Sequence, residues 1–255
     1  MDLGLHGRRA LITGGSRGLG LAAAKSFIDE GVEVVIAAQD PERLSRAAQE
    51  LSARAGRTVA HMALDFSAAD AARRLAEAHG EVDILVNCAG RIPRGDLLSI
   101  DDDLWRQTWD AKVFGYIRLM REIYPRMRTR GRGVMINVMG LGGEMPQATY
   151  VIGGTGNAAL MAATRGIGGR STDDNIRVLG VNPGPIGTDR MLDLQAQRAA
   201  SGAGNPDNSA LPFGRPGKPE EVGDVIVFLA SDRAGYISGT VITIDGGMHH
   251  RHCPI

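Results

Sequence analysis

The segment TGGSRGLG, residues 13–20, decides how this sequence is interpreted. It follows the apolar run ALIT (10–13) and precedes a stretch with helical periodicity that begins near residue 18. Glycines permit a tight strand-to-helix turn and let the backbone approach a ligand closely. Because the N–H groups at a helix N-terminus attract anions, the turn predicts a phosphate or pyrophosphate site. A glycine turn alone does not establish such a site, since glycines also end strands for steric reasons.

Short apolar runs rich in β-branched residues alternate with helical stretches along the whole chain. We expect strands over 10–13, 32–38, 58–64, 83–87, 133–138, 176–182 and 240–245. We expect helices near 18–30, 41–54, 69–79, 101–129 and 219–231, and one that ends near Gly169. Continuous apolar strands separated by helices are typical of a parallel sheet covered on both faces. The sequence therefore predicts an α/β fold with a doubly wound parallel sheet of the Rossmann type, as a single domain over 1–255.

Composition excludes several classes of protein. The chain has 255 residues, of which 43% are hydrophobic and 23% charged. Lys plus Arg and Asp plus Glu both total 29, so no overall field attracts nucleic acid or an anionic membrane. No apolar run is long enough to span a bilayer. With only two cysteines and no sign of a signal peptide, we expect a cytoplasmic protein.

Residues 186–216 form the least regular region, with SGAGNPDNS at their centre. A loop this long in a compact α/β chain is usually a lid or a binding loop. We expect a substrate-binding loop or lid here, and a disordered insertion is the alternative.

Further segments fall at the ends of predicted strands, where open parallel sheets bind ligands. Asp65 ends the third strand, NCAG (87–90) ends the fourth, and NPGPIGT (182–188) follows the sixth. With TGGSRGLG and the C-terminal GRPGKPEEVGDVIVFLASDRAGYISGTVITIDGG, they resemble the short-chain dehydrogenase/reductase family over essentially the whole chain. The resemblance implies an NAD(P)-dependent oxidoreductase that acts on a carbonyl/alcohol pair of a small-molecule substrate, or on another reducible bond. It also implies a homotetramer or homodimer.

The same resemblance assigns residues to the cofactor. Those on the pyrophosphate and adenosine side are Gly14, Ser16, Arg17, Gly18 and Leu19. Asp65 and Phe66 would meet the adenine. The residues along the ribose are Asn87, Ala89 and Gly90, and those that hold the nicotinamide amide are Pro183, Gly184, Ile186 and Thr188.

Residues after the second predicted strand bear on the choice of cofactor. An acid at its tip would bind the ribose 2′-OH and repel a 2′-phosphate. Ala38 stands where NAD-preferring members of the family carry that acid, and Gln39 follows it. Arg17 is placed to pair with a 2′-phosphate, or is an ordinary surface arginine. We expect NADP(H) rather than NAD(H), although Asp40 lies close by and argues the other way.

The catalytic positions depart from the family pattern. When NAAL (157–160) is aligned with the family's K-A-A-L, Asn157 stands in the place of the lysine. Gly153 then occupies the tyrosine position and Gly140 the serine position. On the long helix, the family's N-x-x-G reads Lys112-Val-Phe-Gly115, so lysine and asparagine have exchanged places. We therefore expect an atypical active site, in which two glycines widen the pocket for a bulky substrate.

Several residues are candidates for the missing groups. Lys112 directs its ammonium into the site beside Asn157, or reaches solvent as helix lysines often do. Tyr150, three residues before Gly153, is a displaced acid or a packing residue. Glu144 is an acid/base or a solvated carboxylate, and Cys88 reads as a small buried residue.

The C-terminal residues MHHRHCPI (248–255) contain metal-ligand types, but their spacing matches no known pattern, so we expect no metal site. Three functions stay open at this point: a redox enzyme with Lys112, Tyr150 and Asn157 in its site; a non-redox lyase, isomerase or hydrolase; and a catalytically inactive nucleotide-binding protein.

Overall fold

The computed structural model of the protein describes residues 1–90, 92–188, 191 and 208–251, and it confirms the expected α/β fold. Seven strands of this described part form one parallel sheet in the order β3-β2-β1-β4-β5-β6-β7. The strands are β1 (Arg9–Thr13), β2 (Glu33–Ala38), β3 (Ala60–Ala63), β4 (Ile84–Asn87), β5 (Gly133–Val138), β6 (Ile176–Pro183) and β7 (Val241–Ile244). The order of the strands reverses between β1 and β4, which is where such sheets bind ligands.

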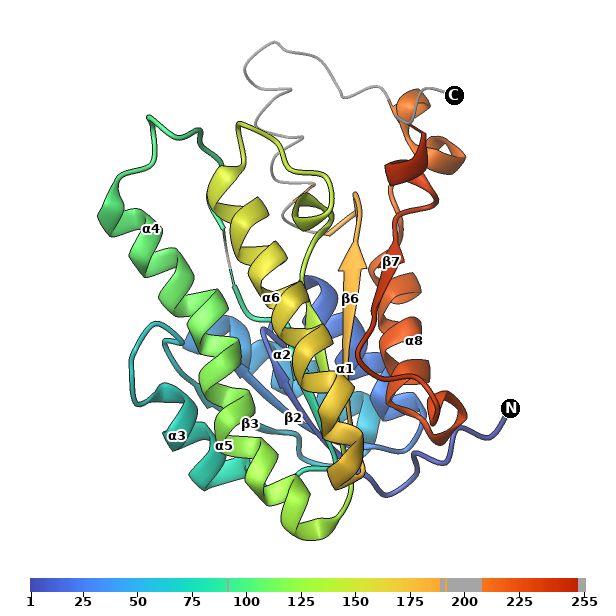
Figure 1. Ribbon diagram of the computed structural model, residues 1–255. Coiled ribbons are helices and arrows are strands. Elements are labelled where there is room, and N and C mark those ends of the chain that lie inside the picture. Colours follow the sequence, from blue (N-terminus) through green and yellow to red (C-terminus); the bar gives the residue numbers. More distant parts are fainter. Residues whose placement is uncertain (91, 189–190, 192–207, 252–255) are drawn as a thin grey trace.

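Helices cover both faces of the sheet (Figure 1). They are α1 (Gly18–Asp29), α2 (Pro41–Ala55), α3 (Ala71–His79), α4 (Asp102–Trp109), α5 (Gly115–Arg130), α6 (Val151–Arg170) and α8 (Pro219–Ala230). The helices α1, α2 and α8 pack on one face, while α3, α5 and α6 pack on the other. Within the described residues, no helix combines the length and the apolar character that a membrane crossing requires.

Each buried strand contributes side chains to two separate cores. In β1, Ala10 and Ile12 join the core beneath α1 and α8, while Leu11 joins the core beneath α3 and α5. Because successive side chains of a strand point to opposite faces, a strand buried on both sides must be apolar at every position. This is why the strands read as continuous rather than alternating apolar runs.

The helical region expected near 101–129 is divided into three parts. A π-helical turn, Asp110–Phe114, separates α4 from α5 and contains Lys112. The Arg118 guanidinium contacts the Asp110 carboxylate at 2.7 Å, so an ion pair spans the widened turn. Such turns are rare and occur frequently at functional sites.

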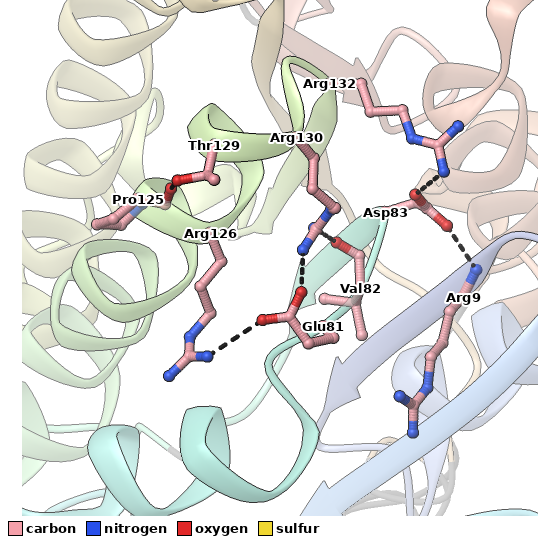
Figure 2. Close-up of polar contacts among 9 residues, drawn as sticks. All are labelled: Arg9, Glu81, Val82, Asp83, Pro125, Arg126, Thr129, Arg130 and Arg132. Carbon is pink, nitrogen blue, oxygen red and sulfur yellow. Dashed lines mark hydrogen bonds and ion pairs between the residues drawn. The ribbon is translucent and has the colours of Figure 1, made fainter.

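The amino-terminal edge of the sheet is held by a cluster of ion pairs (Figure 2). Glu81 pairs with Arg126 at 3.2 Å and with Arg130 at 2.5 Å, which fastens the end of α5 to the start of β4. The Asp83 carboxylate accepts the backbone N–H of Arg9 at 3.0 Å and pairs with Arg132 at 3.1 Å. This cluster lies at the sheet edge opposite the carboxyl ends of the strands, so it supports the fold without entering the ligand-binding edge.

Candidate active site

The glycine turn between β1 and α1 is shaped for a close backbone approach. Gly14 has a φ of +70°, and a β-carbon added to it would lie 2.9 Å from the carbonyl oxygen of Cys88. A β-carbon on Gly20 would lie 2.3 Å from the oxygen of Gly14. Gly18 has a φ of +54° and faces Thr188, whose Cγ2 would be 3.5 Å from an added β-carbon. Three of the glycines are therefore required by the geometry of this turn, two of them by a left-handed backbone.

The N-terminus of α1 leaves its N–H groups available. No side chain caps the first turn, and no acidic residue lies within it. Arg17, at the N-cap position, is extended and half-buried. Uncapped N–H groups and the positive end of the helix dipole are the features that bind a phosphate anion.

The exit of β4 is held against the glycine turn by Thr13. Its hydroxyl accepts the backbone N–H groups of Cys88 at 3.0 Å and Ala89 at 3.1 Å. Asn87 donates its amide to Asn137 at 3.0 Å, which leaves Asn87 Oδ1 buried and without a partner among the described residues. Sequence reasoning missed the role of Thr13, whose only signal was a hydroxyl residue at the end of a buried strand.

Lys112 points inward from the π-helical turn. Its side chain is 7% exposed, and its stem packs on Gly90, where an added β-carbon would lie 3.0 Å from Lys112 Cδ. The ammonium lies 3.5 Å from the carbonyl oxygen of Val138, at the end of β5. It also lies 5.5 Å from the ring of Tyr116, which donates its hydroxyl to the same carbonyl at 3.0 Å. Of the two alternatives for this lysine, the structure therefore has the inward one.

Asn157 approaches the same region from α6. Its side chain is 1% exposed, and its Oδ1 has no partner among the described residues. Its Nδ2 would lie 3.2 Å from a β-carbon added to Gly140, in the segment that leaves β5. The carboxyl end of β5 is thus contacted by Lys112 from one side, while Asn157 lies against the segment that follows it.

Tyr150 is the N-cap residue of α6, and its ring covers Gly153. A β-carbon added to Gly153 would lie 2.1 Å from Cζ of Tyr150, so the ring fills the volume of a side chain at that position. The ring also packs against Gly142, in the turn after β5. The expected widening of the pocket at Gly153 is therefore wrong, since an aromatic ring occupies that space. At Gly140 an added β-carbon would meet the Asn157 amide at 3.2 Å, so a side chain there would also require its neighbour to move.

Glu144 and Cys88 are engaged in other ways. The Glu144 carboxylate accepts the amide of Asn182 at 2.9 Å and the hydroxyl of Thr243 at 3.0 Å, and Arg165 lies 3.7 Å away. It therefore ties the turn after β5 to β6 and β7. Burial raises the pKa of the Cys88 thiol to about 11, against the opposing effect of Lys112. A thiol with this pKa stays protonated near neutral pH and is a poor nucleophile.

Residues expected around the adenosine lie near the ends of β2 and β3. Asp40 caps α2 by accepting the N–H of Arg43 at 3.0 Å, and this bond lowers its pKa. Gln39 is exposed. Asp65 accepts the N–H of Ser67 at 2.9 Å, while Phe66 is 8% exposed and packs in the core with α5.

Residues expected at the nicotinamide follow β6. The N–H of Gly184 donates to Ile244 at 3.0 Å, and Ile186 forms a bridge with Gly217. Thr188 then reaches the glycine turn, as described above. Residues 189–190 and 192–207 of the expected lid lie outside the described residues.

The C-terminal histidines are partly described. Asp245 accepts the backbone N–H of His249 at 2.8 Å and its ring nitrogen at 2.7 Å. His252 and Cys253 lie outside the described residues, and the described part holds no cluster of three or more metal-ligand side chains.

The carboxyl edge of the sheet fits a dinucleotide. The glycine turn supplies a cradle that β-carbons would fill, and the uncapped end of α1 supplies donors. The buried acceptor atoms Oδ1 of Asn87 and Oδ1 of Asn157 remain for donors of a ligand. Because unpaired buried polar atoms are costly, an ordered water or a bound molecule is expected to satisfy these two.

Comparisons with known proteins agree with this geometry. The family described as enoyl-(acyl carrier protein) reductase matches residues 14–249. The chain is 32% identical to the uncharacterized oxidoreductase YvrD of Bacillus subtilis (strain 168), over 97% of this chain and 98% of that protein. It is 31% identical to galactitol 2-dehydrogenase (L-tagatose-forming) of Cereibacter sphaeroides, over 95% of both chains.

A solved structure of L-sorbose reductase from Gluconobacter frateurii, complexed with NADPH and L-sorbose, superposes with a TM-score of 0.90. It is 33% identical, over 97% of this chain and 98% of that one. Nearly the whole chain matches these proteins, and the carboxyl ends of its strands fit a dinucleotide. The protein belongs to the short-chain dehydrogenase/reductase family of NAD(P)-dependent oxidoreductases.

Proposed function

We propose that the protein interconverts a carbonyl and an alcohol on a small-molecule substrate with NADP(H), and that the Tyr150 hydroxyl donates the proton. The observation that carries this proposal is the ring of Tyr150 lying where a side chain of residue 153 would project. Residues 153 and 157 are four apart on α6 and therefore share one face of the helix. The Tyr150 ring thus lies at the point where a side chain of residue 153 would begin, although its backbone is three residues earlier, and this supports Tyr150 as the replacement for the family's tyrosine.

Lys112 and Asn157 are proposed as the other polar groups of this site. The Lys112 ammonium lies at the carbonyl oxygen of Val138, the last residue of β5. The Tyr150 ring packs on Gly142, four residues later in the segment that leaves β5. A buried cation near the reacting oxygen stabilises the negative charge that develops as a proton moves. Asn157 offers an amide with an unpaired oxygen, which suits a hydrogen bond to a ribose hydroxyl, a substrate hydroxyl or a water.

The cofactor residues are proposed as the sequence predicts them, from the glycine turn to Thr188. The nicotinamide supplies the hydride, and the protein supplies orientation and the proton. Preference for NADP(H) is supported by Arg17, for which no described carboxylate is a partner. It is also supported by Asp40, the acid that argued for NAD(H), because its carboxylate is engaged in capping α2. Because Arg17 keeps its charge available, it suits a 2′-phosphate.

The relatives indicate the substrate class. L-sorbose reductase and galactitol 2-dehydrogenase are named for a ketose and a polyol. We therefore propose polyhydroxylated ketones and alcohols as the first compounds to test. The loop over 186–216 is proposed as the substrate-binding lid, and the protein as a cytoplasmic homodimer or homotetramer.

The test is a cofactor titration followed by a substrate panel. NADPH and NADH are titrated against the protein by fluorescence, and NADPH oxidation is then followed with ketoses and neutral ketones. We expect NADPH to bind more tightly than NADH, and Arg17→Gln to remove that difference. If neither cofactor binds at millimolar concentration, the proposal of a redox enzyme fails.

A further inference from the structure

Arg94 lies in an exposed position beside Tyr150. Its guanidinium carbon is 5.9 Å from the centroid of the tyrosine ring. A cation–π contact involves the charge of the guanidinium and uses none of its N–H donors. The contact therefore leaves the N–H donors of the arginine for another partner.

A backbone bridge fixes the two residues relative to each other. The N–H of Gly95 donates to the carbonyl of Thr149 at 3.0 Å, and Gly95 forms an isolated β-bridge with Tyr150. Beneath this bridge, Ile100 and Ile152 pack in an apolar cluster that also contacts the tyrosine. Arg94 and the proposed proton donor are thus carried by two segments that are joined at the same point.

No carboxylate among the described residues pairs with Arg94. The acid two residues later, Asp96, accepts the N–H groups of Ser99 at 2.9 Å and Leu98 at 3.1 Å, and these bonds lower its pKa. Glu144 is held by Asn182 and Thr243. Asp96 is therefore engaged in its own turn, and Glu144 is engaged with β6 and β7.

We propose that Arg94 is a specificity-determining residue that binds an anionic group of the substrate, so that the preferred substrates carry a carboxylate or a phosphate near the reacting carbon. The planar fork of an arginine binds two oxygens of either group in parallel. From its place beside Tyr150, Arg94 would hold such a substrate with its hydroxyl or carbonyl at the phenol. This inference rests on the proposed function, since it assigns the substrate of the same site.

The first experiment compares three substrates that share a carbon chain. Sorbitol is neutral, sorbitol 6-phosphate carries a phosphate, and gluconate carries a carboxylate. Loss of a charge-assisted pair costs roughly 10- to 100-fold in affinity, so we expect an anionic substrate to exceed sorbitol in kcat/KM by this factor. Arg94→Met should raise KM for the anionic substrate by the same factor and leave sorbitol unchanged. The two anionic arms distinguish carboxylate from phosphate.

Arg106 provides the matched control. It is an exposed arginine on neighbouring α4, beside Asp102 at 3.9 Å. Arg106→Met removes the same charge from the surface but should keep the preference for the anionic substrate. Equal kcat/KM values for all three substrates, or a preference that survives Arg94→Met, would overturn the inference and leave the oxidoreductase proposal standing.

A second experiment does not depend on turnover. Tartrate and inorganic phosphate are titrated by calorimetry at constant ionic strength, with saturating NADP+, into the wild type and the two variants. We expect one of the anions to bind the wild type and Arg106→Met alike, and roughly 10- to 100-fold more weakly to Arg94→Met. If no substrate is turned over, the oxidoreductase proposal fails, while this binding difference still supports Arg94. Absent binding, or equal binding to all three proteins, overturns the inference.

Discussion

Gly153→Ala tests the position of the Tyr150 ring. The added methyl group would lie 2.1 Å from Cζ, 2.4 Å from Cε1 and 2.6 Å from Cε2 of that ring. Since carbon atoms not bonded to each other pack at about 3.5–4.0 Å, the ring must move by more than about 1 Å. Overpacking of this kind costs about 1–3 kcal/mol, while replacing a helical glycine by alanine returns about 1 kcal/mol. We expect a net change in unfolding free energy from near zero to about 2 kcal/mol destabilising.

Gly166→Ala is the control on the same helix. Gly166 is exposed, and no atom lies within 4 Å of an added β-carbon. This variant should gain about 1 kcal/mol from helix propensity alone and keep its activity. The two unfolding free energies are compared by urea denaturation, and kcat/KM is measured by NADPH oxidation. Because misplacing a catalytic group by 1 Å costs about 10²-fold, Gly153→Ala should lose activity by that order. If both variants are equally stabilised and equally active, the ring does not occupy this position.

Three further predictions concern other residues of the structure. Lys112→Met should lower kcat/KM by about 10²-fold yet leave the urea midpoint unchanged or higher, because it removes a buried charge and keeps the apolar stem; a lower midpoint with normal activity would make the lysine structural. Asp83→Asn should cost about 1–3 kcal/mol in unfolding free energy without affecting turnover, since Asp83 acts at the opposite sheet edge; a normal midpoint would contradict its role. Cys88 should react with iodoacetamide at pH 8 far more slowly in the folded than in the unfolded protein, by peptide mass spectrometry. Its raised folded pKa stabilises the fold below the unfolded value of 9, and this contribution is lost as the pH rises toward about 11; equal reactivity would refute the burial.

The fold could be predicted from the sequence because its signals are local. Continuous apolar runs located every strand to within two residues, and the largest difference is at β3, which begins two residues later than the run 58–64. The glycine turn was recognisable because a left-handed backbone at Gly14 and Gly18 is a property of the residues themselves.

The site was less predictable because its contacts join distant segments. Glu144 binds partners 38 and 99 residues away, and spacing along the chain carries no signal for such contacts. The π-helical turn at Asp110–Phe114 interrupts a stretch whose periodicity predicts one continuous helical region. Tyr150 has an irregular backbone, with φ −142° and ψ 37°, and this conformation swings the ring back over Gly153. The sequence shows a tyrosine three positions before Gly153. It does not show the backbone conformation that turns the ring back over Gly153.

Tyr150→Phe tests most directly whether the Tyr150 hydroxyl donates the proton. The variant keeps the ring that packs on Gly142 and Gly153 and removes only the hydroxyl. We expect the dissociation constant for NADPH and the urea midpoint to stay as in the wild type. Because a general acid contributes about 10²–10⁴-fold, kcat for carbonyl reduction should fall by that factor, and the alkaline limb of the pH–rate profile should disappear. A variant with the wild-type kcat and an unchanged pH–rate profile would show that Tyr150 is not the proton donor.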